Sequence, residues 1–98
     1  MDAPETIDLY EAIRQMREIT QQGGFFSFGH ATYNRDTDRC DGLRMVRRAS
    51  IRPAAKGDDL THADYKIFYH DHDINLPRIA WQPLIMYFDN KRVILSGS

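Results

Sequence analysis

The chain has 98 residues, of which 42% are hydrophobic, and this length suits a single domain. Its 13 Lys and Arg residues nearly balance its 14 Asp and Glu residues, so the formal net charge of −1 excludes a general attraction to nucleic acid or to an anionic membrane. The one cysteine, Cys40, excludes an internal disulfide, and the longest apolar run, residues 84–88, is far shorter than the roughly 20 residues that cross a bilayer.

The first predicted element is a helix over residues 8–22. Asp8 can accept hydrogen bonds as the N-cap, and Glu11 three positions later completes a capping-box pattern. One apolar stripe follows at helical spacing, formed by Leu9, Ala12, Ile13, Met16, Ile19 and Thr20. Gly23 and Gly24 then supply the left-handed turn that ends a helix.

From residue 25 onward the period changes to two, which predicts strands. The expected strands cover residues 25–33, 43–52, 63–70, 78–88 and 92–95. Asp89 and Asn90 predict a tight hairpin turn before the last strand. The expected fold is α+β, with one N-terminal helix packed on a curled antiparallel sheet of about five strands in a single domain, 1–98.

The second strand alternates only in part. Leu43, Met45, Ala49 and Ile51 are expected on one face, and Arg44, Arg48, Ser50 and Arg52 on the other. Val46 and Arg47 break the alternation, which predicts either a β-bulge or a functional arginine that points inward.

The fourth strand is apolar on both of its faces, although Pro83 implies a bend, a bulge or an unpaired edge within it. One face would carry Ile79, Trp81, Ile85 and Tyr87, and the other Ala80, Leu84, Met86 and Phe88. Such a strand needs cover on both sides, and one short helix covers only one of them. Either barrel curvature or another molecule closes the second face, which makes Trp81 and Tyr87 candidate interaction residues.

Charge is segregated along the chain. Residues 39–56 contain six basic residues and one acidic residue, and residues 57–75 contain five aspartates and one lysine. Arg44, Arg48 and Arg52 are expected to form a row on the second strand. The row could pair with the acidic segment or with a second copy, follow the phosphates of a nucleic acid, or remain solvated. The near-cancelling charges favour pairing.

Three histidines, His62, His70 and His72, are weak candidates for metal ligands. Residues 70 and 72 point the same way in an extended strand, but a zinc site needs three or four protein ligands and the third is not specified here. A solvated turn is the favoured interpretation, and no cofactor or metal is expected.

Two further patterns, a calcium-loop spacing and a lone cysteine, lack the residues that their chemistry requires. The Asn34-x-Asp36-x-Asp38 spacing opens like a calcium loop, but Arg39 replaces the required glycine and Met45 the bidentate glutamate. Cys40 has no histidine close in sequence that could act as its base.

The segments Asp8-Leu9-Tyr10-Glu11-Ala12-Ile13, Met16-Arg17-Glu18, Phe26-Ser27-Phe28, Tyr33-Asn34 and Trp81-Gln82-Pro83-Leu84-x-Met86-Tyr87-Phe88 make up a pattern that runs through most of the chain. In these segments the chain resembles small uncharacterised proteins of bacterial prophage gene clusters. The resemblance implies a phage-type structural or accessory role and carries no functional residue.

Together these patterns predict a non-enzymatic, cytoplasmic protein-interaction or assembly module that binds a protein partner or a second copy, without a membrane. The alternative is a nucleic-acid-binding domain that uses the arginine-rich strand face. A hydrolase or metal enzyme around the histidines ranks last, because no acid–base pair or nucleophile is evident.

Overall fold

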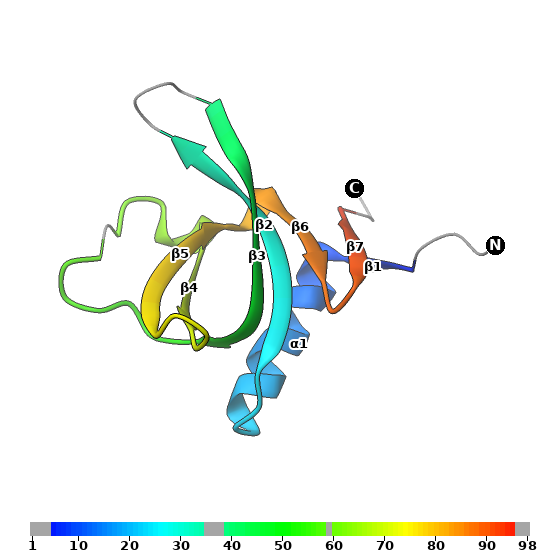
Figure 1. The fold of residues 1–98 in the computed structure, drawn as a ribbon, viewed down its shortest axis with the longest axis horizontal. Coiled ribbons are helices and arrows are strands. Elements are labelled where there is room, and N and C mark those ends of the chain that lie inside the picture. Colours follow the sequence, from blue (N-terminus) through cyan, green and yellow to red (C-terminus); the bar gives the residue numbers. More distant parts are fainter. Residues whose placement is uncertain (1–4, 35–38, 59, 96–98) are drawn as a thin grey trace.

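The computed structural model describes residues 5–34, 39–58 and 60–95 of the chain. The fold is α+β, with one helix, α1 (Leu9–Gln21), on a seven-stranded sheet of order β1-β7-β6-β2-β3-β4-β5. The strands are β1 (Thr6–Asp8), β2 (Phe26–Asn34), β3 (Arg39–Ile51), β4 (Lys66–Asp71), β5 (Leu76–Trp81), β6 (Ile85–Phe88) and β7 (Lys91–Ile94). All pairings are antiparallel except β1 with β7. Figure 1 shows the sheet curling from β7, through the long β2–β3 hairpin, to β4 and β5.

The predicted helix is confirmed. The Asp8 carboxylate accepts the backbone N–H groups of Tyr10 at 3.0 Å and Glu11 at 3.3 Å, which satisfies two donors that have no partner within the helix. At the other end, Gly23 adopts φ 81°, and the Gly24 N–H donates to the Ile19 carbonyl at 2.9 Å.

The hydrophobic core lies between α1 and the concave face of the sheet. From the helix it takes Leu9, Ala12, Ile13 and Met16, and from the strands Ile7, Phe26, Phe28, Val46, Ala49, Ile67, Tyr69, Ala80, Ile85 and Phe88. Phe28 packs edge-on against Tyr69, with ring centroids 4.9 Å apart. Phe26, Phe28 and His30 of β2 are buried on the same face of the strand.

The expected number of about five strands is wrong, because the described residues form seven. The three-residue β1 is too short to show a period in the sequence, and it pairs in parallel with β7. The expected strand 63–70 starts later than predicted, because its first residues form the 3-10 helix η1 (Ala63–Tyr65).

The predicted two-sided strand 78–88 is also wrong. The 3-10 helix η2 (Gln82–Leu84) interrupts it, with Pro83 inside the turn, where a residue without an N–H is tolerated. The two halves belong to different parts of the sheet, since β5 is an edge strand beside β4 and β6 lies between β7 and β2. No single ribbon that is apolar on both faces remains to be covered.

The predicted β-bulge in the second strand is confirmed. Phe28 pairs with Val46 but Phe26 pairs with Ala49, so β3 carries one extra residue between these positions. For the residues of β3 that precede the bulge, the two faces are the reverse of those expected. Met45 faces outward and Val46 is buried. Arg47 does not point inward, because its side chain is 85% exposed.

Across the described ranges, no helix combines the length and the hydropathy needed to cross a membrane.

Candidate functional site

The outer face of the central strands β6, β2 and β3 has a floor of small residues and large side chains on either side. Ser27, Gly29 and Ala31 lie on β2, and Gly29 pairs with Met45 of β3 on one side and with Tyr87 of β6 on the other. A Cβ atom on Gly29 would lie 2.5 Å from the Met45 sulfur, so the Met45 side chain lies across β2 at this point. Glycine permits that close approach.

This face is open to solvent and largely apolar. Met45 is 59% exposed, Leu43 49% and Tyr87 40%. A hollow of about 430 Å³ lies between Met45 and Tyr87, with Ser27 at its edge. Large apolar side chains gathered at a hollow are typical of an interaction surface rather than of isolated surface residues.

A basic and an acidic side chain also line the hollow, on opposite sides of Ser27. The Asp89 N–H donates to the Ser27 carbonyl at 3.0 Å, which fixes Asp89 on the β6 side. The bulge places Arg47 on the β3 side. We call this set the outer-face surface: Ser27, Gly29, Ala31, Leu43, Met45, Arg47, Tyr87 and Asp89.

Arg47 is only loosely held within its own chain. Its Nε lies 3.5 Å from Asp73, whose other carboxylate oxygen accepts Arg48 Nε at 2.8 Å. One carboxylate thus serves two guanidinium groups, and Arg48 has the shorter contact. Asp89 lies 3.7 Å from the Lys91 ammonium.

The expected row of Arg44, Arg48 and Arg52 does not form, because the bulge turns Arg44 to the other face from Arg48 and Arg52. Arg48 pairs with Asp73, and Arg52 makes a largely buried ion pair with Asp58 at 2.8 Å. Arg52 also donates to the carbonyls of Tyr69 at 3.0 Å and Arg78 at 3.3 Å. Both arginines therefore meet the acidic segment, as the pairing alternative expects.

Arg44 faces the interior, beside a buried polar pair that the sequence pattern did not indicate. His30 Nε2 lies 2.9 Å from the Tyr69 hydroxyl, and Arg44 lies within hydrogen-bonding reach of the same hydroxyl. Burial lowers the pKa of His30, and the charges of Arg44 and Arg78 lower it further, although the Ala31 carbonyl opposes them. Burial raises the pKa of Tyr69. The one sequence feature that could have indicated a buried His30 is its position on the same strand face as Phe28.

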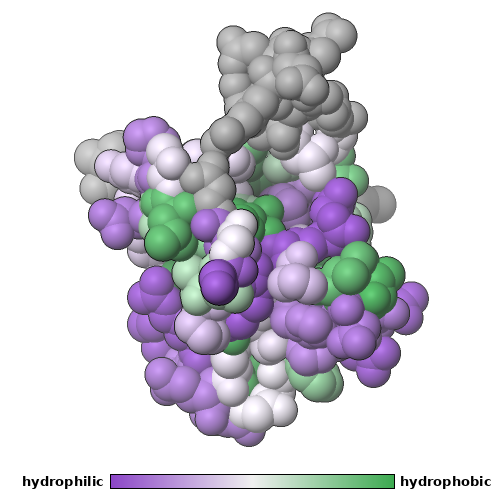
Figure 2. Space-filling view, turned by 90° about the vertical axis from the view of Figure 1, so that its left-hand side faces the viewer, coloured by the Kyte–Doolittle hydropathy of each residue, from purple (hydrophilic) through white to green (hydrophobic). Residues whose placement is uncertain are grey.

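Of the two predicted aromatic interaction residues, Tyr87 belongs to the outer-face surface and Trp81 does not. Trp81 is half-buried in β5, with the Lys66 ammonium 4.9 Å from its ring centre and the His62 ring 6.3 Å away. Figure 2, which views the molecule from the β5 side, shows hydrophobic residues as separate patches within a mostly hydrophilic surface.

The structure brings two of the three candidate histidines together. The rings of His70 and His72 lie 4.6 Å apart, with His72 Nε2 2.8 Å from the Ser50 hydroxyl and His70 Nε2 2.9 Å from the Asn75 amide oxygen. His62 contacts Trp81 instead. Within the described part of the chain, no three His, Cys, Asp or Glu residues are grouped so that they could hold a metal ion.

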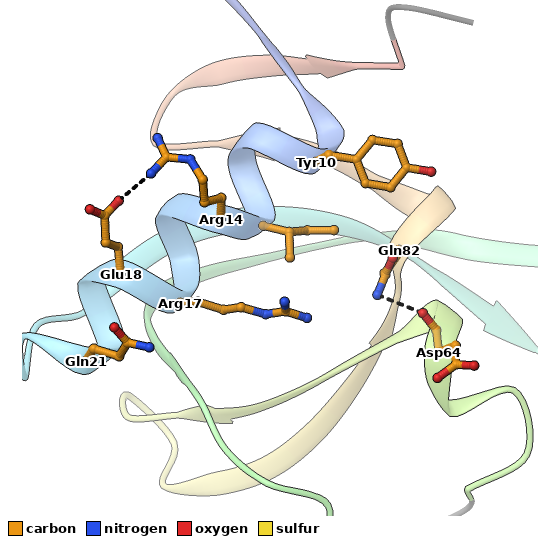
Figure 3. Close-up of a pocket in the computed structure, with 8 residues that line it drawn as sticks. Tyr10, Arg14, Arg17, Glu18, Gln21, Asp64 and Gln82 are labelled. Carbon is orange, nitrogen blue, oxygen red and sulfur yellow. Dashed lines mark hydrogen bonds and ion pairs between the residues drawn. The ribbon is translucent and has the colours of Figure 1, made fainter.

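A polar cleft of about 570 Å³ lies between α1 and the two 3-10 helices (Figure 3). The Arg17 side chain extends from α1 towards Gln82, whose amide donates to the Asp64 carbonyl at 3.2 Å. Arg14 is held on the helix surface by Glu18 at 2.9 Å. The cleft is open and is lined mainly by polar and charged side chains.

A smaller apolar groove of about 260 Å³ runs beside it. It is lined by Leu9, Tyr10, Tyr65, Gln82, Pro83, Ile85, Met86, Val93, Ile94 and Leu95. No charged side chain lines this groove, so it lacks the paired charges of the outer face.

No protein-family model, no curated protein and no solved structure matched this chain.

Proposed function

We propose that the protein is a non-enzymatic assembly module that pairs with a second copy of itself through the outer-face surface. One observation carries the proposal. Met45 and Tyr87 flank β2 at one level, and Arg47 and Asp89 flank it at the next level. Met45 and Arg47 on the β3 side of β2 thus each have a complementary side chain on the β6 side.

This arrangement is self-complementary under a two-fold rotation. If two copies meet face to face with the axis parallel to β2, the β3 side of one copy lies over the β6 side of the other. Met45 of each copy then contacts Tyr87 of its partner copy, and Arg47 meets Asp89. A methionine sulfur against an aromatic ring is a favourable contact, and the two ion pairs fix the register of the faces.

The small residues of β2 explain why such a contact can be close. Ser27, Gly29 and Ala31 leave a shallow trough between the flanking strands, in which the Met45 side chain lies over Gly29, and paired sheets pack at about 10 Å. The surface is one three-strand face of a small protein, so its interface falls at the low end of known sizes, below about 1,200 Å². We therefore expect a dimer that dissociates on dilution.

Nucleic-acid binding has less support than self-association. Such a domain needs free cations along one face, but Arg48 and Arg52 are paired with aspartates and Arg44 faces inward. The phage-type role, the cytoplasmic location and the absence of enzymatic activity all stay predictions.

Sedimentation velocity over a wide range of concentration tests the proposal. The wild-type protein should shift from monomer to dimer as its concentration rises, and Met45→Lys should stay monomeric. Met86→Lys is the matched control, because Met86 is also exposed, at 43%, but lies in the apolar groove. A wild-type monomer at the highest concentration, or equal loss in both variants, would contradict the proposal.

A further inference from the structure

Two arginines converge on the interior of the curled sheet from opposite sides. Arg44 of β3 is the register partner of His30, and Arg78 of β5 is the register partner of Tyr69. The Tyr69 hydroxyl contacts His30 at 2.9 Å and lies within reach of Arg44. β5 curls back to contact β2 (Figure 1), and the charges of both arginines act on His30 and on Tyr69.

One donor in this cluster has no partner. The Arg78 Nε is buried, and no group in the described part of the chain accepts its hydrogen. Leaving a buried donor unsatisfied costs about 1–3 kcal/mol, more when the group is charged, so such a group usually marks a position where an ion or a water molecule binds.

The local charge favours an anion over water. Among the side chains of residues 5–32, 42–58 and 60–95, no carboxylate forms an ion pair with Arg44 or Arg78. The charge of Asp71 affects the Tyr69 hydroxyl less than the charge of either arginine does, and the Asp71 carboxylate accepts the Asp73 N–H at 3.0 Å. Two positive charges therefore face one aspartate that is already engaged.

His30 and Tyr69 do not compensate for this charge. Burial and the two arginines keep the pKa of His30 low, so the imidazole is neutral near pH 7. If Nδ1 donates to the Ala31 carbonyl at 3.3 Å, Nε2 accepts the Tyr69 hydroxyl, and the phenol oxygen remains free to accept from Arg44. The His30–Tyr69 pair thus positions Arg44.

We infer that Arg44 and Arg78 together bind a small oxyanion of the phosphate class at this inner end of the sheet. Guanidinium groups suit such a ligand, because their planar N–H donors match two oxygens at once. The site is separate from the outer-face surface and does not depend on dimer formation.

Titration calorimetry at constant ionic strength tests the inference with two ligands, inorganic phosphate and methyl phosphate. We expect saturable binding of at least one of them, weakened about tenfold or more in Arg44→Gln and in Arg78→Gln. Arg17→Gln, which changes an exposed arginine of α1, should bind as the wild type does. If only inorganic phosphate binds, the ligand is the free ion. If methyl phosphate also binds, the site accepts a phosphate ester as well.

An NMR titration of the wild-type protein keeps the test valid if a variant does not fold. The Nε–H signal of Arg78 should shift as phosphate is added and should saturate. The inference is overturned if neither ligand binds, if all three arginine variants lose binding equally, or if the Arg78 signal does not respond.

Discussion

The Tyr69 hydroxyl and His30 Nε2 lie 2.9 Å apart and join β4 to β2 across the interior, although β3 separates these strands in the sheet. The hydrogen bond therefore links two strands that share no backbone ladder. It helps to hold the curl that brings β5 back towards β2.

Tyr69→Phe removes this bond and leaves the buried His30 without its hydroxyl partner. We expect the free energy of unfolding to fall by about 1–3 kcal/mol, the cost of an unsatisfied buried polar group. Chemical denaturation measures the loss. Tyr65→Phe provides the control, since Tyr65 is 61% exposed, and its stability should match that of the wild type.

Stability should also depend on pH through His30. Its pKa in the folded state lies below the ordinary histidine value of 6.5, so the unfolded chain binds more protons between the two values. Stability is therefore fully present above about pH 6.5 and falls as the pH drops towards the folded-state pKa. Urea unfolding at neutral and mildly acidic pH should show a shallower dependence in His30→Gln than in the wild type. An unchanged dependence would show that another group is responsible.

We expect Arg52 to hold residues 53–58, which follow β3, against the sheet. It pairs with Asp58 at 2.8 Å and donates to the carbonyls of Tyr69 and Arg78. Arg52→Ala removes all of these contacts, and we expect it to destabilise the protein by about 1–3 kcal/mol. Hydrogen exchange should be faster at residues 53–58. Arg48→Ala, which removes a more exposed ion pair, should cost less than about 1 kcal/mol.

Gly29→Val tests the shape of the outer-face surface without changing its charge. The new side chain would meet the Met45 sulfur and displace it, which the flexible end of a methionine permits. We expect a folded protein whose self-association weakens about tenfold, because the trough is filled. Circular dichroism checks the fold and sedimentation the association. Wild-type dimerisation in this variant would exclude the trough from the interface.

Local features of the fold were predictable where one residue dictates the backbone. Asp8 and Gly23 set the ends of the helix, and Asp89 and Asn90 adopt the positive φ values, 50° and 64°, that a tight hairpin turn requires. Val46 and Arg47 marked the bulge, since they broke the alternation of an otherwise regular strand.

The remaining features depend on contacts that no local pattern records. The bulge shifts the register by one residue, which turned Met45 to the outside and Arg44 to the inside. Pro83 was compatible with a bend within one strand, but the chain instead crosses from β5 to β6. The His30–Tyr69 pair spans 39 positions, so neither residue signals the other in the sequence. Tyr87 was predicted as an interaction residue and does lie on the outer-face surface. Its neighbours Met45 and Gly29 were not predicted as interaction residues.

The most direct test of self-association mixes two variants with opposite charge changes. Arg47→Asp and Asp89→Lys should each be monomeric, because each places like charges opposite one another on both sides of the two-fold axis in its own homodimer. Mixed in equal amounts they should form a heterodimer, since both pairs are then attractive. Asp89 lies at φ 50°, so Asp89→Lys costs about 1 kcal/mol of stability, and circular dichroism confirms that it folds. Sedimentation of the mixture as a dimer, with each variant alone a monomer, is the result that we predict. A mixture that remains monomeric while the wild type dimerises would contradict pairing through Arg47 and Asp89.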